Sequence, residues 1–134
     1  GVAIRFPDRR NDHEVEFVII IGKTGSRIKK EDAMDYVAGY TVANDVSARD
    51  WIPDIKSGEP PFGPTHGWER NIMGKNLPGF TPCGPFVVTK DEIANPHDLH
   101  LQTRLNGEVM QDTKTDDLIF KLPEIISYYS ICMG

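Results

Sequence analysis

The sequence predicts an α+β fold in which strands outnumber helices. The apolar run at 17–21 and the alternating run at 99–105 are typical of strands, and only 31–37 and 123–129 show helical spacing of apolar residues. With 134 residues and 39% hydrophobic content, the chain can bury one core, so a single domain over residues 1–134 is expected.

The first half of the chain predicts two strands with a short helix between them. Residues 1–12 are polar and are expected to form a loop before the first strand. The run at 17–21 (FVIII) has no polar position, which is typical of a strand buried on both faces. A short helix is predicted for 31–37, with Gly39 as its C-terminal stop. The β-prone stretch 40–44 then predicts a second strand.

Residues 53–74 show no periodicity. Prolines stand at 53, 60, 61 and 64 and glycines at 58, 63 and 67, so this segment is expected to be an irregular loop. A structureless loop of about 20 residues inside a compact domain is uncommon and is often functional. We expect it to act as a lid, and the alternative is a disordered insertion.

The second half predicts more strands and a closing helix. Residues 86–89 form a short β-prone run, and 99–105 alternates between apolar and polar positions. The dipeptide Asn106-Gly107 is a strong signal for a hairpin turn, from which the chain returns at 108–111. Pro123 suits the first position of a helix.

Three carboxylates in two stretches are the candidate functional residues. Glu14 and Glu16 lie two residues apart directly before a buried strand, so their side chains point to the same face. Asp45 follows the second strand, at a predicted junction with a helical turn over 45–50. Carboxylates beside a buried strand are unfavourable without a cationic partner, and a hard divalent ion is the simplest one. The alternative is a strand with an ordinary solvent-facing acidic side.

Composition excludes several classes of partner. The net charge is −5 and no stretch of Lys and Arg forms a basic patch, so nucleic acid is not expected. No apolar run approaches the roughly 20 residues of a membrane helix. The two cysteines, Cys83 and Cys132, have no metal-binding spacing and are expected to be free, mostly buried thiols. This favours a cytoplasmic location, with an organellar matrix as the alternative.

Several stretches resemble the catalytic C-terminal domain of the fumarylacetoacetate hydrolase family, which includes fumarylpyruvate and acylpyruvate hydrolases and 2-hydroxyhepta-2,4-diene-1,7-dioate isomerases. The block NDVSARD at 44–50 is the most specific of them. The matching stretches, in family order, are HEVEFVIIIGK (13–23), DAMDYVAGYTVANDVSARDW (32–51), GKN (74–76), GPFVVTKDEI (84–93), NGEVMQD (106–112) and LIFKLPEIISY (118–128).

The resemblance implies a mixed β-sandwich roll, usually a homodimer, with Mg²⁺, Mn²⁺ or Ca²⁺ held by Glu14, Glu16 and Asp45. It implies a small keto-acid substrate and catalytic roles for Arg49 and Lys75. The leading hypothesis is a metal-dependent hydrolase that cleaves a C–C bond in a β-diketo acid through a metal-stabilised enolate. The alternatives are a decarboxylase or isomerase on the same metal platform, and a non-catalytic relative.

The chain departs from the family pattern in three places. Ile52 stands where the family usually has Gln. The family's His–Glu catalytic pair lies upstream of the metal strand, and its closing G-D-x-x-x-T-G-T-P segment follows the point where this sequence stops. We therefore expect the domain to be incomplete at both ends.

Other interpretations of the cations and histidines stay open. Arg49 can grip a substrate carboxylate or pair structurally with Asp50 or Asp45. Lys75 can stabilise a developing oxyanion or lie in solvent as an ordinary surface lysine. His66, in an H-x-x-E pattern, is a minor candidate for a general base. His13 is expected to point away from Glu14 and not to bind metal.

Overall fold

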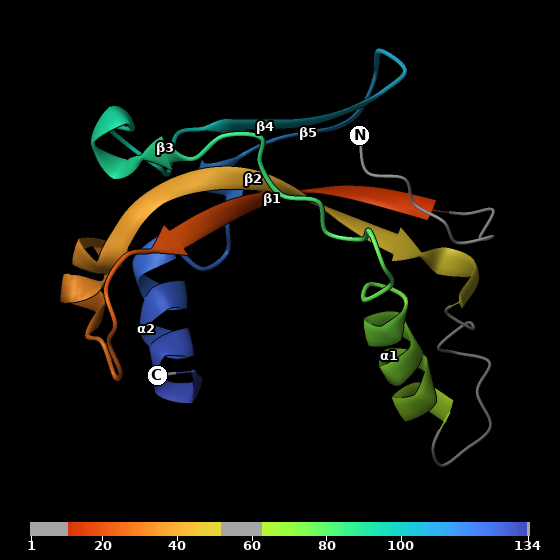
Figure 1. The fold of residues 1–134 in the computed structure, drawn as a ribbon, viewed down its shortest axis with the longest axis horizontal. Coiled ribbons are helices and arrows are strands. Elements are labelled where there is room, and N and C mark those ends of the chain that lie inside the picture. Colours follow the sequence, from red (N-terminus) through yellow and green to blue (C-terminus); the bar gives the residue numbers. More distant parts are fainter. Residues whose placement is uncertain (1–10, 52–62, 134) are drawn as a thin grey trace. The chain divides into compact units, whose positions relative to one another are not determined.

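A computed structural model describes residues 11–51 and 63–133 of the chain (Figure 1). It has the strand-rich α+β character that the sequence predicts. The strands are β1 (Asn11–Ile21), β2 (Val37–Ala48), β3 (Val88–Thr89), β4 (His100–Leu105) and β5 (Glu108–Lys114). The helices are α1 (Gly63–Met73) and α2 (Leu122–Cys132), with 3₁₀ turns at Lys30–Tyr36, Arg49–Trp51, Lys90–Glu92 and Thr115–Asp117.

The strands form two sheets, and the chain forms two compact units. One sheet has the order β1-β2-β3 and the other pairs β4 with β5. One unit comprises residues 1–16 and 43–83, and the other comprises 17–42 and 84–134. Strands β1 and β2 run continuously from one unit into the other. The single-domain assignment over residues 1–134 stays a prediction.

The unit of residues 17–42 and 84–134 holds the larger apolar core. The ring of Phe17 on β1 stacks on Tyr40 of β2, with centroids 5.3 Å apart. Helix α2 contributes Leu122, which is fully buried, and Ile126. The other members of this cluster are Ile28, Ala33 and Val37. The apolar ends of both strands are therefore fixed by packing in this unit.

Strand β2 is longer than the sequence predicts. It extends through Ala48, and the helical turn begins only at Arg49. Asp45 therefore lies inside a strand and not at a strand–helix junction, so this part of the prediction is wrong. Backbone pairing explains the difference, because the N–H groups of Asn44 and Ala48 donate to the carbonyls of Pro82 and Gly74, each at 3.0 Å.

The segment predicted as an irregular loop is helical over its second part. Residues 63–73 form α1, and 52–62 lie outside the described residues. The loop predicted for 63–73 is therefore wrong. Proline is compatible with a helix at this point because Pro64 is the second residue of α1, and N–H groups in the first turn have no intrahelical acceptor. Whether this segment acts as a lid stays a prediction.

Two smaller expectations have opposite outcomes. The turn at Asn106-Gly107 joins β4 to β5 with positive φ at both residues, 51° and 91°, as an Asn-Gly hairpin requires. Cys83 and Cys132 are free thiols, but both are exposed, so their predicted burial is wrong. Cys83 belongs to an isolated bridge opposite Ala43, and Cys132 ends α2.

The core around α2 gives a first testable prediction. Leu122→Ala should lower the free energy of unfolding by about 2–5 kcal/mol, because it leaves a cavity at a fully buried site. Urea denaturation followed by far-UV circular dichroism measures the change. Ile119→Ala is the control, since Ile119 is 89% exposed. An equal loss of unfolding free energy in both variants would show that packing at Leu122 does not stabilise this unit.

Candidate metal centre

Strand β1 presents two glutamates to one side. Glu14 and Glu16 are separated by one residue in extended backbone, so their side chains leave the same face. The side chain of Glu14 is 28% exposed, and Glu16 is exposed as a residue. The apolar part of β1 follows at once with Phe17, which fixes the face of the strand to which these glutamates belong.

Strand β2 brings Asp45 to the same place. One carboxylate oxygen from each of Glu14, Glu16 and Asp45 lies within 4.8 Å of the others. The sequence predicted this convergence, although it placed Asp45 at the end of a strand. The continuation of β2 past Asp45 sets the side-chain direction, because alternation in the strand points Asp45 and Ser47 the same way.

Lys75 reaches the carboxylates from the segment that follows α1. Its Nζ donates hydrogen bonds to Glu14 Oε2 at 2.8 Å, to Asp45 Oδ2 at 2.5 Å and to Ser47 Oγ at 2.9 Å. The backbone holds this segment against β2, because the Ala48 N–H donates to the carbonyl of the buried Gly74. Lys75 is therefore part of this cluster and not a lysine in open solvent.

Arg49 pairs with the other side of Glu14. Its Nη2 donates to Glu14 Oε1 and, at 2.7 Å, to Asp12 Oδ2, which also accepts from Arg49 Nε at 3.0 Å. Asp12 and Glu14 are two apart on β1, so both face the guanidinium. The sequence considered Asp50 or Asp45 as the structural partner of Arg49, and the structure shows Asp12 and Glu14 in that position.

The pKa values follow from these contacts. Lost hydration, and then the charges of Asp45 and Glu14, raise the pKa of Glu16. Burial alone would lower the pKa of Lys75, but its hydrogen bonds to Asp45 and Glu14 outweigh this effect and raise it. The hydrogen bond with Arg49 lowers the pKa of Asp12 and, in return, raises that of Arg49. The cluster therefore keeps Lys75 and Arg49 charged and disfavours the ionised form of Glu16.

The donor set fits a hard divalent cation. Three carboxylates supply oxygen ligands, which Mg²⁺, Mn²⁺ and Ca²⁺ prefer over nitrogen or sulfur. The Lys75 ammonium already lies between Glu14 and Asp45, which shows that their oxygens converge on one cationic position. Glu14, Glu16 and Asp45 are the residues that would hold such an ion.

Two residues of this cluster were missed by the sequence analysis. Ser47 is fully buried and accepts from Lys75, and Asp12 holds Arg49. The spacing of Ser47 from Asp45 would have indicated a shared face, but the predicted helical turn over 45–50 concealed it. Asp12 was assigned to the polar loop expected over residues 1–12, whereas β1 begins at Asn11.

Of the four histidines, three contact residues other than the three carboxylates. His13 contacts Asn44, with its Nδ1 3.0 Å from Asn44 Nδ2. His97 Nε2 accepts a hydrogen bond at 3.2 Å from the backbone N–H of Leu122, the first residue of α2. His100 pairs with Asp112 on the hairpin of β4 and β5. His66 lies in α1, but its side chain is outside the described residues, as is Ile52.

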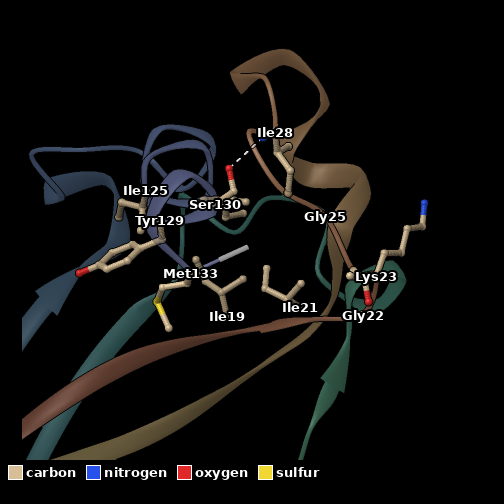
Figure 2. Close-up of a pocket in the computed structure, with 12 residues that line it drawn as sticks. Ile19, Ile21, Gly22, Lys23, Gly25, Ile28, Ile125, Tyr129, Ser130 and Met133 are labelled. Carbon is tan, nitrogen blue, oxygen red and sulfur yellow. Dashed lines mark hydrogen bonds between the residues drawn. The ribbon is translucent and has the colours of Figure 1, made fainter.

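A separate cavity of about 620 Å³ lies within the unit of residues 17–42 and 84–134. Figure 2 shows Ile19 and Ile21 of β1 facing α2 residues and Met133, with the Ser130 hydroxyl bonded to the Ile28 backbone N–H at 2.9 Å. None of the three carboxylates lines this cavity, and its lining includes no carboxylate. This cavity is therefore distinct from the carboxylate cluster.

The fold and the cluster together define a class of protein: a strand-rich α+β fold with a cluster of three carboxylates that could hold a divalent cation. A sequence model described as "Fumarylacetoacetate (FAA) hydrolase C-terminal" matches residues 1–134. The chain therefore belongs to the fumarylacetoacetate hydrolase family. Within residues 11–51 and 63–133, no helix is both long and apolar enough to cross a bilayer.

Named relatives carry different activities. The chain is 44% identical over 119 residues to the mitochondrial oxaloacetate tautomerase Fahd2a of Rattus norvegicus, covering 89% of this chain and 34% of that protein. It is 41% identical over 118 residues to a bifunctional isomerase/decarboxylase of 4-hydroxyphenylacetate degradation from Salmonella dublin, covering 88% of this chain and 25% of that protein. The chain thus spans about a third or less of these two relatives.

Solved structures share the fold. A maleylpyruvate hydrolase from Sphingobium sp. SYK-6, in complex with manganese (II) ion and pyruvate, superposes with a TM-score of 0.78 at 29% identity. The match covers 99% of this chain and 43% of that one. A 2-hydroxyhepta-2,4-diene-1,7-dioate isomerase from Mycobacterium marinum has a TM-score of 0.76 at 30% identity, over 95% and 44% of the two chains.

The donor set predicts loss of metal binding when a carboxylate is removed. Glu16→Gln should weaken Mn²⁺ binding more than about 100-fold, because changes to residues beyond the ligands already cost about 10–100-fold. Isothermal titration calorimetry measures the dissociation constant. Glu108→Gln on the hairpin is the control. Mn²⁺ affinity within twofold of the parent for Glu16→Gln would show that Glu16 is not a ligand.

Metal should also stabilise the folded chain. Saturating Mn²⁺ should raise the midpoint of thermal unfolding, and excess EDTA should reverse the shift, because a ligand that binds only the folded state stabilises it by mass action. Differential scanning fluorimetry with and without the ion checks this. Asp45→Asn should abolish the shift. A shift of equal size in that variant would locate the ion somewhere other than at Asp45.

Proposed function

We propose that this chain supplies the divalent-metal centre of an enzyme that stabilises the enolate of a small keto acid. The observation that carries the proposal is the convergence of Glu14, Glu16 and Asp45 within 4.8 Å, with Lys75 bonded to two of them. A bound Mg²⁺, Mn²⁺ or Ca²⁺ would act as a Lewis acid toward two neighbouring substrate oxygens.

The chain's own residues then divide the work. Glu14, Glu16 and Asp45 hold the ion, and three carboxylates leave roughly half of a six-coordinate shell for substrate and water. Lys75 places a positive charge beside the same oxygens, where it can stabilise negative charge that develops on the substrate. Arg49, 35% exposed and bonded to Asp12, is positioned to pair with a substrate carboxylate.

The reaction class that we favour is proton transfer through an enolate, as in a keto-acid tautomerase or isomerase. Tautomerisation moves one proton between carbon and oxygen, so it needs a group that takes the proton and returns it, but no activated water. Support comes from the oxaloacetate tautomerase at 44% identity. The proposal extends only to the part of such an enzyme that this chain spans.

Hydrolysis of a C–C bond in a β-diketo acid is the second candidate. It passes through the same enolate and also needs a base that activates water. The maleylpyruvate hydrolase solved with manganese and pyruvate supports this candidate. Assaying oxaloacetate tautomerisation against acylpyruvate cleavage, with oxaloacetate decarboxylation followed as well, separates the alternatives.

The oligomeric state and the cellular location are proposals as well. We propose a homodimer that takes a small keto-acid substrate, as the family resemblance implies. The mitochondrial relatives favour an organellar matrix over the cytoplasm expected from the cysteines. Analytical ultracentrifugation tests the dimer, and a sedimentation coefficient of a monomer at micromolar concentration would contradict it.

Replacing Lys75 tests the catalytic assignment. Lys75→Met should lower kcat for the substrate that the parent turns over by about 100-fold, because a charge aimed at the developing oxyanion is lost. Mn²⁺ affinity should not fall, since the lysine is not a ligand. Lys114→Met, on the exposed hairpin, is the control. Kinetics of Lys75→Met near those of the parent would show that Lys75 only balances charge.

Replacing Arg49 tests substrate binding. Arg49→Lys should mainly raise KM and leave kcat nearly unchanged, because an ammonium cannot reproduce the planar two-point grip of a guanidinium on a carboxylate. Steady-state kinetics on the same substrate separates the two constants, with Arg104→Lys as the control. An unchanged KM would assign Arg49 to the structural pairing with Asp12 and Glu14 alone.

A further inference from the structure

On the face of the sheet opposite the carboxylates, His13 and Asn44 form a cross-strand pair. The sheet order places β1 and β2 side by side. Successive side chains of a strand point to opposite faces, so His13 lies behind Glu14 and Asn44 lies behind Asp45. Asn44 Nδ2 is 3.0 Å from His13 Nδ1, within hydrogen-bond distance.

Asn44 is tied to its other neighbour as well. Its backbone N–H donates to the Pro82 carbonyl at 3.0 Å, and the adjacent Ala43 forms a bridge with Cys83. Asn44 therefore connects β1 through its side chain to the 82–83 segment through its backbone. Both connections lie within the unit of residues 1–16 and 43–83, which also holds all three carboxylates.

The amide of Asn44 is held at an energetic disadvantage. Its Oδ1 is buried and has no hydrogen-bond partner, and no other buried side-chain oxygen or nitrogen in the described part of the chain shares that condition. An unsatisfied buried acceptor is unfavourable. An apolar residue of similar volume would remove this disadvantage, so the amide is explained better by a requirement for the cross-strand bond than by packing.

We propose that His13 and Asn44 are positioning residues that fix the distance between the Glu14 and Asp45 carboxylates for metal binding. Their hydrogen bond joins β1 to β2 one residue behind each ligand. It therefore restrains the separation and the register of the two strands where ligand spacing is decided. This inference rests on the proposed metal centre and concerns affinity for the ion, independently of the reaction.

The test measures Mn²⁺ affinity by isothermal titration calorimetry on the 134-residue chain. His13→Leu and Asn44→Leu should each weaken binding about tenfold, comparable with the loss of residues that orient metal ligands. The double variant should be no weaker than either single variant, because both remove the same bond. His13→Gln should stay within about threefold of the parent, since its side-chain carbonyl can accept from Asn44.

The glutamine variant separates positioning from packing. If the imidazole acts only by filling space, His13→Phe should keep the affinity and His13→Gln should lose it. Thr103→Val is the matched control, because it removes a cross-strand side-chain bond of 2.8 Å to Gln111 in the other sheet. Circular dichroism checks that each variant folds. If Asn44→Leu does not fold, the Mn²⁺ affinities of the His13 variants test the positioning role.

Each outcome bears on one proposal or the other. Unchanged Mn²⁺ affinity in His13→Leu, or an equal loss in Thr103→Val, overturns the positioning role. A parent chain that binds Mn²⁺ but turns over no keto acid contradicts the proposed function. The positioning role is then still decided by the Mn²⁺ affinities of the variants. A parent chain that binds no Mn²⁺ contradicts both.

Discussion

Convergence of like charges is the constraint on which the rest of this structure depends. Glu14, Glu16 and Asp45 place oxygens within 4.8 Å of one another, and such a cluster is unstable without positive charge nearby. Lys75 and Arg49 provide it, and with Asp12 included four formal negative charges face two positive ones. The remaining deficit equals the charge of one divalent cation. The electrostatics of the cluster therefore favour the ion that the proposed chemistry requires.

Each of the two long strands has a charged part at the carboxylate cluster and an apolar part in the core. In β1, polar residues through Glu16 precede the apolar run that starts at Phe17. In β2, Tyr40 is buried in the apolar core, whereas Asp45 joins the carboxylates five residues later. Because side chains alternate along a strand, the extended backbone of β1 and β2 fixes the face from which each carboxylate projects.

The sequence predicted the convergence of the three carboxylates better than it predicted their surroundings. Glu14 and Glu16 could be paired because alternation within one strand is a local rule, and Asp45 was selected with them. The length of β2 could not be predicted in the same way, because it depends on hydrogen bonds to Pro82 and Gly74, more than 25 positions further along the chain. Ser47 was missed for the same reason. Asp12 was missed because β1 begins at Asn11, earlier than expected, and the helix at 63–73 was obscured by its glycines and prolines.

Lys75 links charge balance to catalysis. Its ammonium is bonded to Glu14 Oε2 and Asp45 Oδ2, on two of the three carboxylates that would hold a divalent ion. Each carboxylate has a second oxygen, so Lys75 and an ion could share the same two side chains. Ser47 Oγ, which is no part of the carboxylate set, stays available as an acceptor and keeps the ammonium near the centre. The contacts that balance the charge of the carboxylates would thus also keep a positive charge beside a substrate enolate.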